Sequence, residues 1–228
     1  MNRVINVLSF FFAGSYCVIA IALVYDLSVS SATLKGMLYK FETTSGLALI
    51  VLLLGLLRIK RRWIGMKDIR EFGQFTFSAT LSKTGRNHAL TATVVEVSFM
   101  VALLVLCSQM AKIEPLFSVP MMAVVGILAL EGIIFAVKIM SSAPAFRIGV
   151  SPQVVALFNR EIHLFYFTGL KRIELLGNRI NFQYRDNLNI ILPIDQISPG
   201  DRRAFRDALI AVLEPKNIFI DDAFRSFE

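Results

Sequence analysis

Cysteine and histidine are scarce in this sequence, and it has none of the motifs that mark the common catalytic and cofactor sites. It contains two cysteines and two histidines. Cys17 and Cys107 fall within apolar runs, which predicts small apolar side chains and neither a disulfide framework nor a zinc site. His88 and His163 form no pair at metal-ligand spacing. Phosphate-binding loops, dinucleotide fingerprints and nucleophile elbows do not occur. We therefore expect no enzyme activity, no metal and no cofactor.

Charge is also scarce, and long hydrophobic runs take its place. Charged residues make up 18% of the chain and hydrophobic residues 55%, with 19 Phe and a mean hydropathy of +0.62. Such a composition is typical of membrane proteins, in which about 20 apolar residues form one crossing. The sequence predicts a four-helix transmembrane domain over residues 1–143. Its expected helices cover residues 4–25, 43–59, 90–111 and 119–140. The first run also resembles a signal peptide, but its length and the lack of a small-residue cleavage site favour an anchor.

Basic residues gather between the second and third apolar runs. Lys and Arg concentrate on the cytoplasmic side of membrane proteins, so residues 58–89 are predicted to form a basic cytoplasmic loop and both termini to be cytoplasmic. The net charge of +7 then indicates an anionic membrane surface and not nucleic acid. The residues expected to contact anionic lipid headgroups at the membrane surface are Arg58, Lys60, Arg61, Arg62, Trp63, Lys67 and Arg70.

The aromatic residues of this loop leave its structure open. Trp63 and Phe72 belong to an apolar series that recurs every three residues, so the segment could lie flat among the headgroups. Equally, the second helix could extend into the cytosol and pack its aromatic residues on the C-terminal domain. Phe75, Phe77 and Ala79 alternate with polar residues, which also allows a short strand.

From residue 144 the hydrophobic period changes from that of helices to that of strands. Turn residues separate six short β-rich segments, at 146–150, 153–158, 162–167, 170–176, 179–184 and 188–192. Ser198 to Asp201 is a helix start, and Phe205 and Leu209 lie on the apolar face of the helix that follows, with Arg206 off that face. We expect an α+β cytoplasmic domain over residues 144–214, built as a small antiparallel barrel or sandwich that a C-terminal helix closes.

This order of elements resembles the bacterial pleckstrin-homology-like (PH-like) domains, including the YcxB-like type, which often follow membrane helices. The residues that carry the resemblance are Ile148-Gly149-Val150-Ser151-Pro152 at the entrance, Leu170-Lys171-Arg172-Ile173-Glu174 in the middle strand, and Asn187 to Ile194 before the capped helix. The chain departs from many such domains at Thr168-Gly169, where an aromatic residue often precedes the middle strand. The resemblance covers residues 145–214 and implies a bacterial protein with a binding or assembly module more than an enzyme.

Two glutamates interrupt the later apolar runs. Glu96 lies about 9 Å and Glu131 about 13 Å from the inner ends of their helices, at a rise of about 1.5 Å per residue. A lone ionised carboxylate is costly there, so each is expected to be protonated, hydrogen-bonded to a neighbour or paired with a cation from another chain. We expect polar contacts that fix helix packing or hold a partner subunit. A proton-linked or ion-linked site is the alternative.

The last residues, 215–228, are too apolar for a free tail. We expect an apolar docking tail in which Phe219, Phe224 and Phe227 contact a partner. The target is either the chain's own membrane-facing loop or another chain, and the sequence does not choose between them.

These features predict a non-catalytic accessory or assembly subunit of a bacterial inner-membrane protein complex. Its PH-like domain and apolar tail would contact protein or lipid headgroups. The expected partners are the lipid bilayer, other membrane-protein subunits and anionic lipid headgroups, with no nucleic acid. A small ion-coupled or proton-coupled transport component that uses Glu96 and Glu131 is the alternative.

Overall fold

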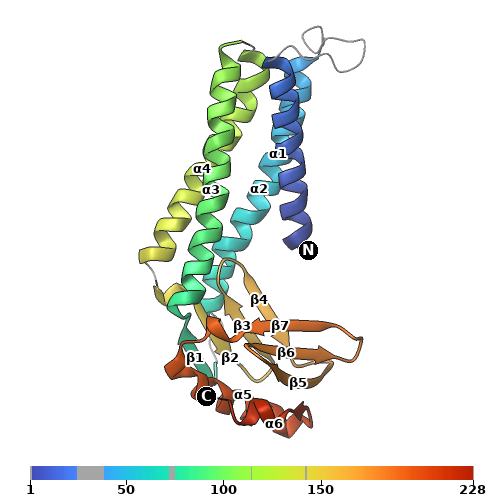
Figure 1. The fold of residues 1–228 in the computed structure, drawn as a ribbon, viewed down its shortest axis with the longest axis vertical. Coiled ribbons are helices and arrows are strands. Elements are labelled where there is room, and N and C mark those ends of the chain that lie inside the picture. The colour runs from blue at the N-terminus through green and yellow to red at the C-terminus, as the bar shows by residue number, and fades with distance from the viewer. Residues whose placement is uncertain (1, 25–38, 72–74, 114, 142, 228) are drawn as a thin grey trace. The chain divides into compact units, whose positions relative to one another are not determined.

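The computed structural model describes residues 2–24, 39–71, 75–113, 115–141 and 143–227 (Figure 1). It divides into two compact units. The helical unit comprises Met1–Lys60 and Ala92–Val137, and the α+β unit comprises Arg61–Thr91 and Lys138–Glu228.

Four long helices account for the apolar runs of the sequence. They are α1 (Asn2–Val24), α2 (Lys40–Glu71), α3 (Lys83–Ala111) and α4 (Pro115–Ser141). Among the described residues, α2, α3 and α4 are long and apolar enough to cross a membrane, whereas the apolar stretch of α1, Val7–Ile21, is shorter. A helical part with membrane-spanning dimensions is therefore confirmed, and the crossing by α1 stays a prediction.

Glycines let the helices of the helical unit approach one another closely. A Cβ atom on Gly55 of α2 would clash with the side chain of Leu128 on α4. A Cβ on Gly132 of α4 would lie 2.6 Å from Cγ2 of Val97 on α3. Small residues at such contacts are the usual means by which membrane helices pack. Helix α4 is thus packed against both α2 and α3.

The predicted loop over residues 58–89 is wrong, because most of this segment is helix or strand. Helix α2 continues to Glu71, strand β1 covers Phe77–Thr80, and α3 begins at Lys83. The end of α2 packs on the α+β unit to which it belongs, since a Cβ on Gly65 would lie 3.0 Å from the Phe158 ring. Of the alternatives for this segment, the helix extension and the short strand are therefore both confirmed.

Two four-stranded sheets form the α+β unit. The first has the order β1-β2-β3-β4 and is antiparallel throughout, and the second has the order β7-β6-β5-β8. In the second sheet β8 runs parallel to β5, and the other pairs are antiparallel. The six predicted strands form within one residue of their expected bounds. They are β2 (Arg147–Val150), β3 (Val154–Phe158), β4 (Ile162–Tyr166), β5 (Leu170–Leu176), β6 (Arg179–Tyr184) and β7 (Asn189–Pro193).

Strand β1 completes the first sheet although α3 and α4 separate it from β2 in the sequence. Phe77 pairs with Val150 and Thr80 with Arg147. The α+β unit is therefore larger than the predicted domain of residues 144–214, because it includes a strand contributed from before α3. The pairing also requires that the segments before α3 and after α4 lie on the same side of any membrane that α3 and α4 cross.

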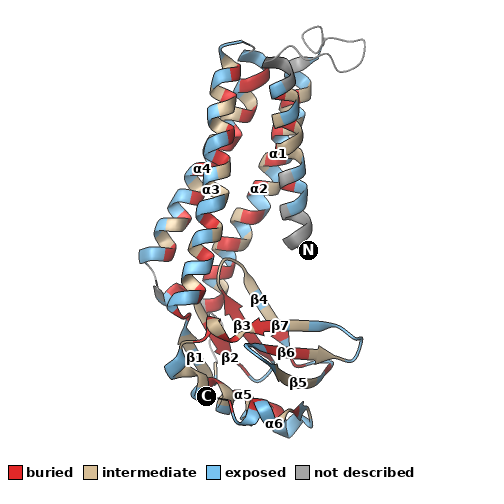
Figure 2. Ribbon diagram, in the orientation of Figure 1, coloured by how far each residue is buried: buried red, intermediate tan, exposed pale blue. Residues whose placement is uncertain are grey.

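The core of the α+β unit is aromatic and lies between the sheets and helix α5 (Arg202–Leu213). All five residues of β3 are buried (Figure 2). Phe205 is fully buried on α5, and its ring lies 5.9 Å from that of Phe77 on β1. The predicted start of this helix needs a correction, since Ser198 makes no side-chain cap hydrogen bond and a 3-10 turn, Pro199–Asp201, precedes α5. Its predicted apolar face is confirmed by the burial of Phe205 and Leu209.

The C-terminal tail belongs to the α+β unit. After a 3-10 turn (Glu214–Lys216), strand β8 (Phe219–Ile220) joins the second sheet and the short helix α6 (Asp222–Arg225) contacts β5 and α5. Arg206 of α5 binds the end of the tail, because its Nη1 donates a 2.7 Å hydrogen bond to the carbonyl oxygen of Phe227. The side chain of Arg206 is 12% exposed, so it is mostly buried although it lies off the apolar face of the helix.

We expect Arg206→Ala to loosen the tail, and Arg203→Ala, at an exposed position of the same helix, to leave it unchanged. Loss of a charge-assisted hydrogen bond should cost about 1–2 kcal/mol of local stability. Hydrogen exchange of the backbone amides of residues 219–227 measures this. Equal exchange in the two variants would show that the Arg206 contact does not hold the tail.

Candidate functional site

A buried ion pair joins α2 and α3 inside the helical unit. Nη1 of Arg58 donates to Oε1 of Glu96 over 2.6 Å. The side chains are 7% and 16% exposed, respectively. Of the three expected states, Glu96 is therefore hydrogen-bonded to a neighbour, and that neighbour is a cation of its own chain. Arg58 correspondingly is not a surface residue.

This ion pair is suited to fixing the positions of α2 and α3. Opposite charges in a low-dielectric interior attract strongly, but each charge also loses its hydration, so the net effect depends on both partners being present. Nε of Arg58 is buried without a hydrogen-bond partner. The contact between Nη1 and Glu96 is therefore the one that compensates the charge of Arg58. Removal of either partner would leave the other charge buried.

The other acid of the apolar runs, Glu131, lies on α4 and is half-buried. Its neighbour Leu130 is 63% exposed, as a residue on the lipid-facing side of a membrane helix is expected to be. Ile127 and Ile134, about one helical turn before and after Glu131, are 54% and 57% exposed, so Glu131 lies beside the exposed apolar face of α4. This position is compatible with the predicted polar contact and does not identify the contacting group.

The basic residues predicted to contact lipid headgroups divide into buried and exposed groups. Arg58 and Arg62 are 6% and 3% exposed and present almost no surface to a lipid. Arg61 and Trp63 are half-buried, whereas Lys60 and Lys67 are exposed. The side chain of Arg70 lies outside the described part of the chain. Folding of this segment as a helix explains the division, because one helix face is turned to the protein.

The three aromatic residues predicted to dock on a partner also differ in burial. Phe224 and Phe227 are 0% and 8% exposed within the α+β unit, and their rings lie 5.7 Å apart. They therefore fill the chain's own core and leave little surface for a partner. Phe219 is 57% exposed, and the guanidinium carbon of Arg172 lies 5.1 Å from the centre of its ring.

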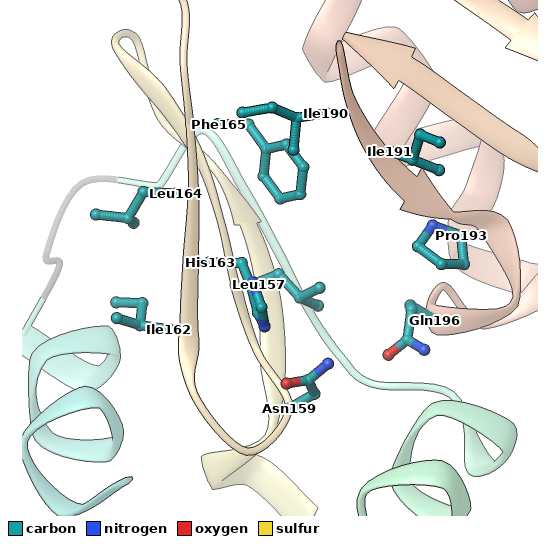
Figure 3. Close-up of a pocket in the computed structure, with 10 residues that line it drawn as sticks. All are labelled: Leu157, Asn159, Ile162, His163, Leu164, Phe165, Ile190, Ile191, Pro193 and Gln196. Carbon is teal, nitrogen blue, oxygen red and sulfur yellow. The ribbon is translucent and has the colours of Figure 1, made fainter. Parts of the chain in front are cut away.

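A pocket of about 360 Å³ lies between the two sheets of the α+β unit (Figure 3). Strands β3 and β4 form one wall, and β7 with the 3-10 turn η3 (Ile194–Gln196) forms the other. Leu157 and His163 are register partners, so their side chains share one face of the first sheet. Figure 3 shows this pair opposite Pro193 and Gln196. We call this cavity the inter-sheet pocket.

The lining of the inter-sheet pocket is apolar over most of its area, with neutral polar groups toward one end. Phe165 connects the pocket to the core, since its ring lies 4.9 Å from that of Phe182. Asn159, His163 and Gln196 are the polar lining residues, and none of the lining residues is an acid, a lysine or an arginine. Such a lining suits binding of a small uncharged molecule better than transfer of a proton or an ion.

His163 and Gln196 are two of the polar residues that line the pocket. His163 is exposed, yet partial desolvation by its surroundings lowers its pKa, and the weaker opposing effect of Glu161 does not cancel this. Gln196 is 7% exposed, and its Oε1 is buried without a hydrogen-bond partner in the described structure. The imidazole of His163 is therefore neutral at pH 7, and the amide oxygen of Gln196 is enclosed by the protein.

Sequence reasoning did not find this pocket. Its residues come from separate strands and a 3-10 turn, and none belongs to a motif with a characteristic spacing. In the sequence, His163 stands out only as a possible metal ligand, and it has no partner at the required spacing. The described residues contain no group of three or more metal-ligating side chains, and both cysteines are free thiols.

Comparison with protein-family models, curated proteins and solved structures found no match to this chain.

Proposed function

We propose that the chain is a non-catalytic accessory subunit of a bacterial inner-membrane protein complex. The helical unit anchors it and packs against other membrane subunits, and the α+β unit is its binding module. The observation that carries this proposal is the Arg58–Glu96 ion pair. The two charges compensate each other within one chain, 2.6 Å apart, as a structural contact does.

The same observation weighs against ion or proton coupling. A coupling carboxylate has to exchange its ion or proton with a pathway of polar groups. Glu96 has a guanidinium partner on α2, and exchange would leave the charge of Arg58 uncompensated. A scaffold gains from such a fixed contact, whereas a carrier is hindered by it.

For the α+β unit we propose a PH-like fold. The antiparallel order β1-β2-β3-β4, the order β7-β6-β5 and the helix α5 that follows support it. In this proposal β1 is the first strand of the domain, and α3 and α4 are inserted between its first and second strands. Domains of this kind act as binding modules, and the inter-sheet pocket supports that use here.

We place both termini and the segment between α2 and α3 in the cytoplasm under this proposal. The excess of basic residues in that segment supports the assignment. The pairing of β1 with β2 supports placing this segment and the C-terminal unit on one side of the membrane. Exposed Lys60 and Lys67 are then the residues that meet anionic headgroups, and exposed Phe219 is the aromatic residue that meets a protein partner.

We expect Glu131→Leu to weaken association with the other subunits and Glu131→Gln to preserve it. Glutamine keeps the size and the hydrogen-bonding capacity of the side chain, whereas leucine loses a polar contact worth about 1–2 kcal/mol in membranes. Leu130→Ala, at the exposed neighbouring position, is the matched control. The measurement is the fraction of tagged chain that migrates as a complex in native gels after gentle extraction.

Two results would contradict the proposal. If the wild-type chain migrated at the size of a single chain, it would belong to no complex and the proposal would fail. Loss of a pH-dependent activity in Glu131→Gln, with the complex intact, would replace the scaffold with the ion-coupling alternative.

A further inference from the structure

The inter-sheet pocket lies along the free edge of strand β4. Among the described strands, β4 is the end strand of the first sheet and pairs with β3 alone. Successive residues of β4, numbered 162–165, all line the pocket. Successive side chains of a strand point to opposite faces of the sheet, so a cavity that touches all of them has to reach the edge of the strand. Figure 3 shows Ile162 and Leu164 on one side of β4 and Phe165 on the other.

The ladder between β3 and β4 determines which backbone groups lie at that edge. The N–H of Phe167 donates a 2.9 Å hydrogen bond to the carbonyl oxygen of Gln153, at the position that extends the ladder by one residue pair. Hydrogen-bonded and non-hydrogen-bonded pairs alternate along an antiparallel ladder, so Phe165 and His163 also bond to β3. Leu164 lies between them, and its N–H and C=O groups therefore point away from β3. Within the described part of the chain, no hydrogen bond engages these two groups.

Strand β7 presents a second free edge on the far side of the pocket. The N–H of Tyr184 donates a 2.9 Å hydrogen bond to the carbonyl oxygen of Leu188, so the same alternation turns the backbone groups of Ile191 away from β6. Pro193 lies on this edge too and has no N–H to offer. A gap between two strand edges admits one extended chain. It does not admit the edge of a second folded sheet, which argues against a second copy of this chain.

The edge of β4 lacks the features that keep other edge strands unpaired. Natural sheets protect their edges with charged side chains, proline or β-bulges. The sequence of β4, Ile-His-Leu-Phe-Tyr, has no proline, lysine, arginine or acid, and its register with β3 is uninterrupted. The lowered pKa of His163 keeps that side chain neutral as well. This edge is therefore suited to pairing with another strand.

The lining of the pocket determines the side chains that such a strand would carry. Leu157 and Phe165 line it from the first sheet, and Ile190 and Pro193 from the second. No acid, lysine or arginine lines it, so a charged side chain would enter without a partner. In an extended segment every second side chain points to the same side. The matching segment is therefore uncharged and has an apolar residue at every second position.

We propose that the edge of β4 binds an extended, uncharged segment of another subunit, which joins the first sheet as a further strand and inserts alternate apolar side chains into the inter-sheet pocket. This inference rests on the proposed function of the α+β unit as a binding module. Main-chain hydrogen bonds to Leu164 provide the affinity, and the apolar lining selects the side chains, as in other cases of strand addition.

The probe for this site is the peptide acetyl-Thr-Val-Thr-Val-Thr amide, titrated into the full chain in lipid nanodiscs. NMR follows binding and the hydrogen exchange of each backbone amide. We expect saturable binding that slows exchange of the Leu164 N–H at least about tenfold. Exchange of the His163 and Phe165 amides should not change, because both already bond to β3.

Two altered peptides separate the main-chain contact from the side-chain contact. Proline in place of the central threonine removes the N–H opposite Leu164 and keeps both valines. Aspartate in place of both valines keeps every N–H and brings charge to the pocket. Each altered peptide should bind at least about tenfold more weakly than the first.

Leu164→Pro tests the edge from the side of the protein. It removes an N–H that points away from β3, a position at which edge strands tolerate proline, and should weaken peptide binding about tenfold. Asn189→Pro is the matched control, because it removes an outward N–H of β7 at an exposed residue outside the pocket lining. The amide spectrum of each variant shows whether the fold is kept.

The proposal is overturned if the first peptide does not bind, if its proline form binds equally well, or if the Leu164 amide gains no protection in the wild-type chain. These titrations use the chain alone. Their failure beside an intact complex in native gels would overturn this site only, whereas migration as a single chain would overturn the proposed function.

Discussion

Phe205→Asp is expected to unfold the α+β unit while the chain stays inserted in the membrane. Phe205 is fully buried on α5, where its ring meets that of Phe77. A carboxylate at this position would be desolvated without a partner and would remove an aromatic side chain from the core. The expected cost is about 4 kcal/mol, which is a large part of the stability of a domain.

The matched control is Ala204→Asp, one residue earlier. Ala204 is exposed in the first turn of α5, where an acid is tolerated and interacts favourably with the helix dipole. Both variants add the same charge to the same helix, so net charge cannot explain a difference between them. Limited proteolysis of membrane vesicles measures the outcome. Equal protease resistance would mean that α5 does not close the core through Phe205.

The strands of the α+β unit could be predicted from the sequence because their pattern is local. Ile180 and Phe182 of β6 are buried, as the alternation of apolar and polar residues predicts. Asn181, between them, is also buried, at 8% exposed. Its Nδ2 lies 3.5 Å from Oε2 of Glu174 on β5, which in turn is paired with Arg172. Polar neighbours on the outer face therefore cover a residue that the pattern assigned to water.

The partner of β1 could not be predicted from a local pattern. Phe77 and Ala79 alternate with polar residues, which indicates a strand but not its neighbour in the sheet. Two membrane-length helices lie between β1 and β2, so the pairing is long-range in sequence. A domain boundary drawn where the hydrophobic period changes, at residue 144, therefore excluded a strand of the same unit.

The ion pair and the pocket escaped prediction for the same kind of reason. Arg58 ends an apolar run, which indicates a side chain that reaches the headgroups, and only helix packing brings it to Glu96. The inter-sheet pocket likewise exists only after two sheets have packed. Gln196 carries no recognisable signal in the sequence, because its burial follows from the packing of η3 and not from a local pattern.

Removal of either partner of the ion pair is expected to destabilise the helical unit strongly. Arg58→Leu leaves the Glu96 carboxylate buried, and Glu96→Leu leaves the Arg58 guanidinium buried. Each single variant should cost about 3 kcal/mol, because a buried charge loses an oppositely charged partner 2.6 Å away in a site of low dielectric. The double variant Arg58→Leu/Glu96→Leu should recover most of this stability, since apolar side chains can replace a buried ion pair without loss.

A double-mutant cycle measures this interaction directly, with unfolding followed in mixed micelles as the fraction of SDS is raised. The control is Leu57→Ala, which changes an exposed, lipid-facing residue of α2 next to Arg58. Additive effects of the two single variants would mean that Arg58 and Glu96 do not stabilise each other.

The double variant also tests most directly whether the chain is a scaffold or a carrier. The complex is purified through the double-variant chain, and both its amount and its pH-dependent activity are measured. A scaffold needs α2 and α3 to be packed but does not need the charge of Glu96. We predict that Arg58→Leu/Glu96→Leu retains wild-type amounts of the complex with an unchanged pH profile, whereas each single variant loses complex. A double variant that assembles fully but has lost the pH-dependent activity would contradict the account, because Glu96 would then act as a coupling residue.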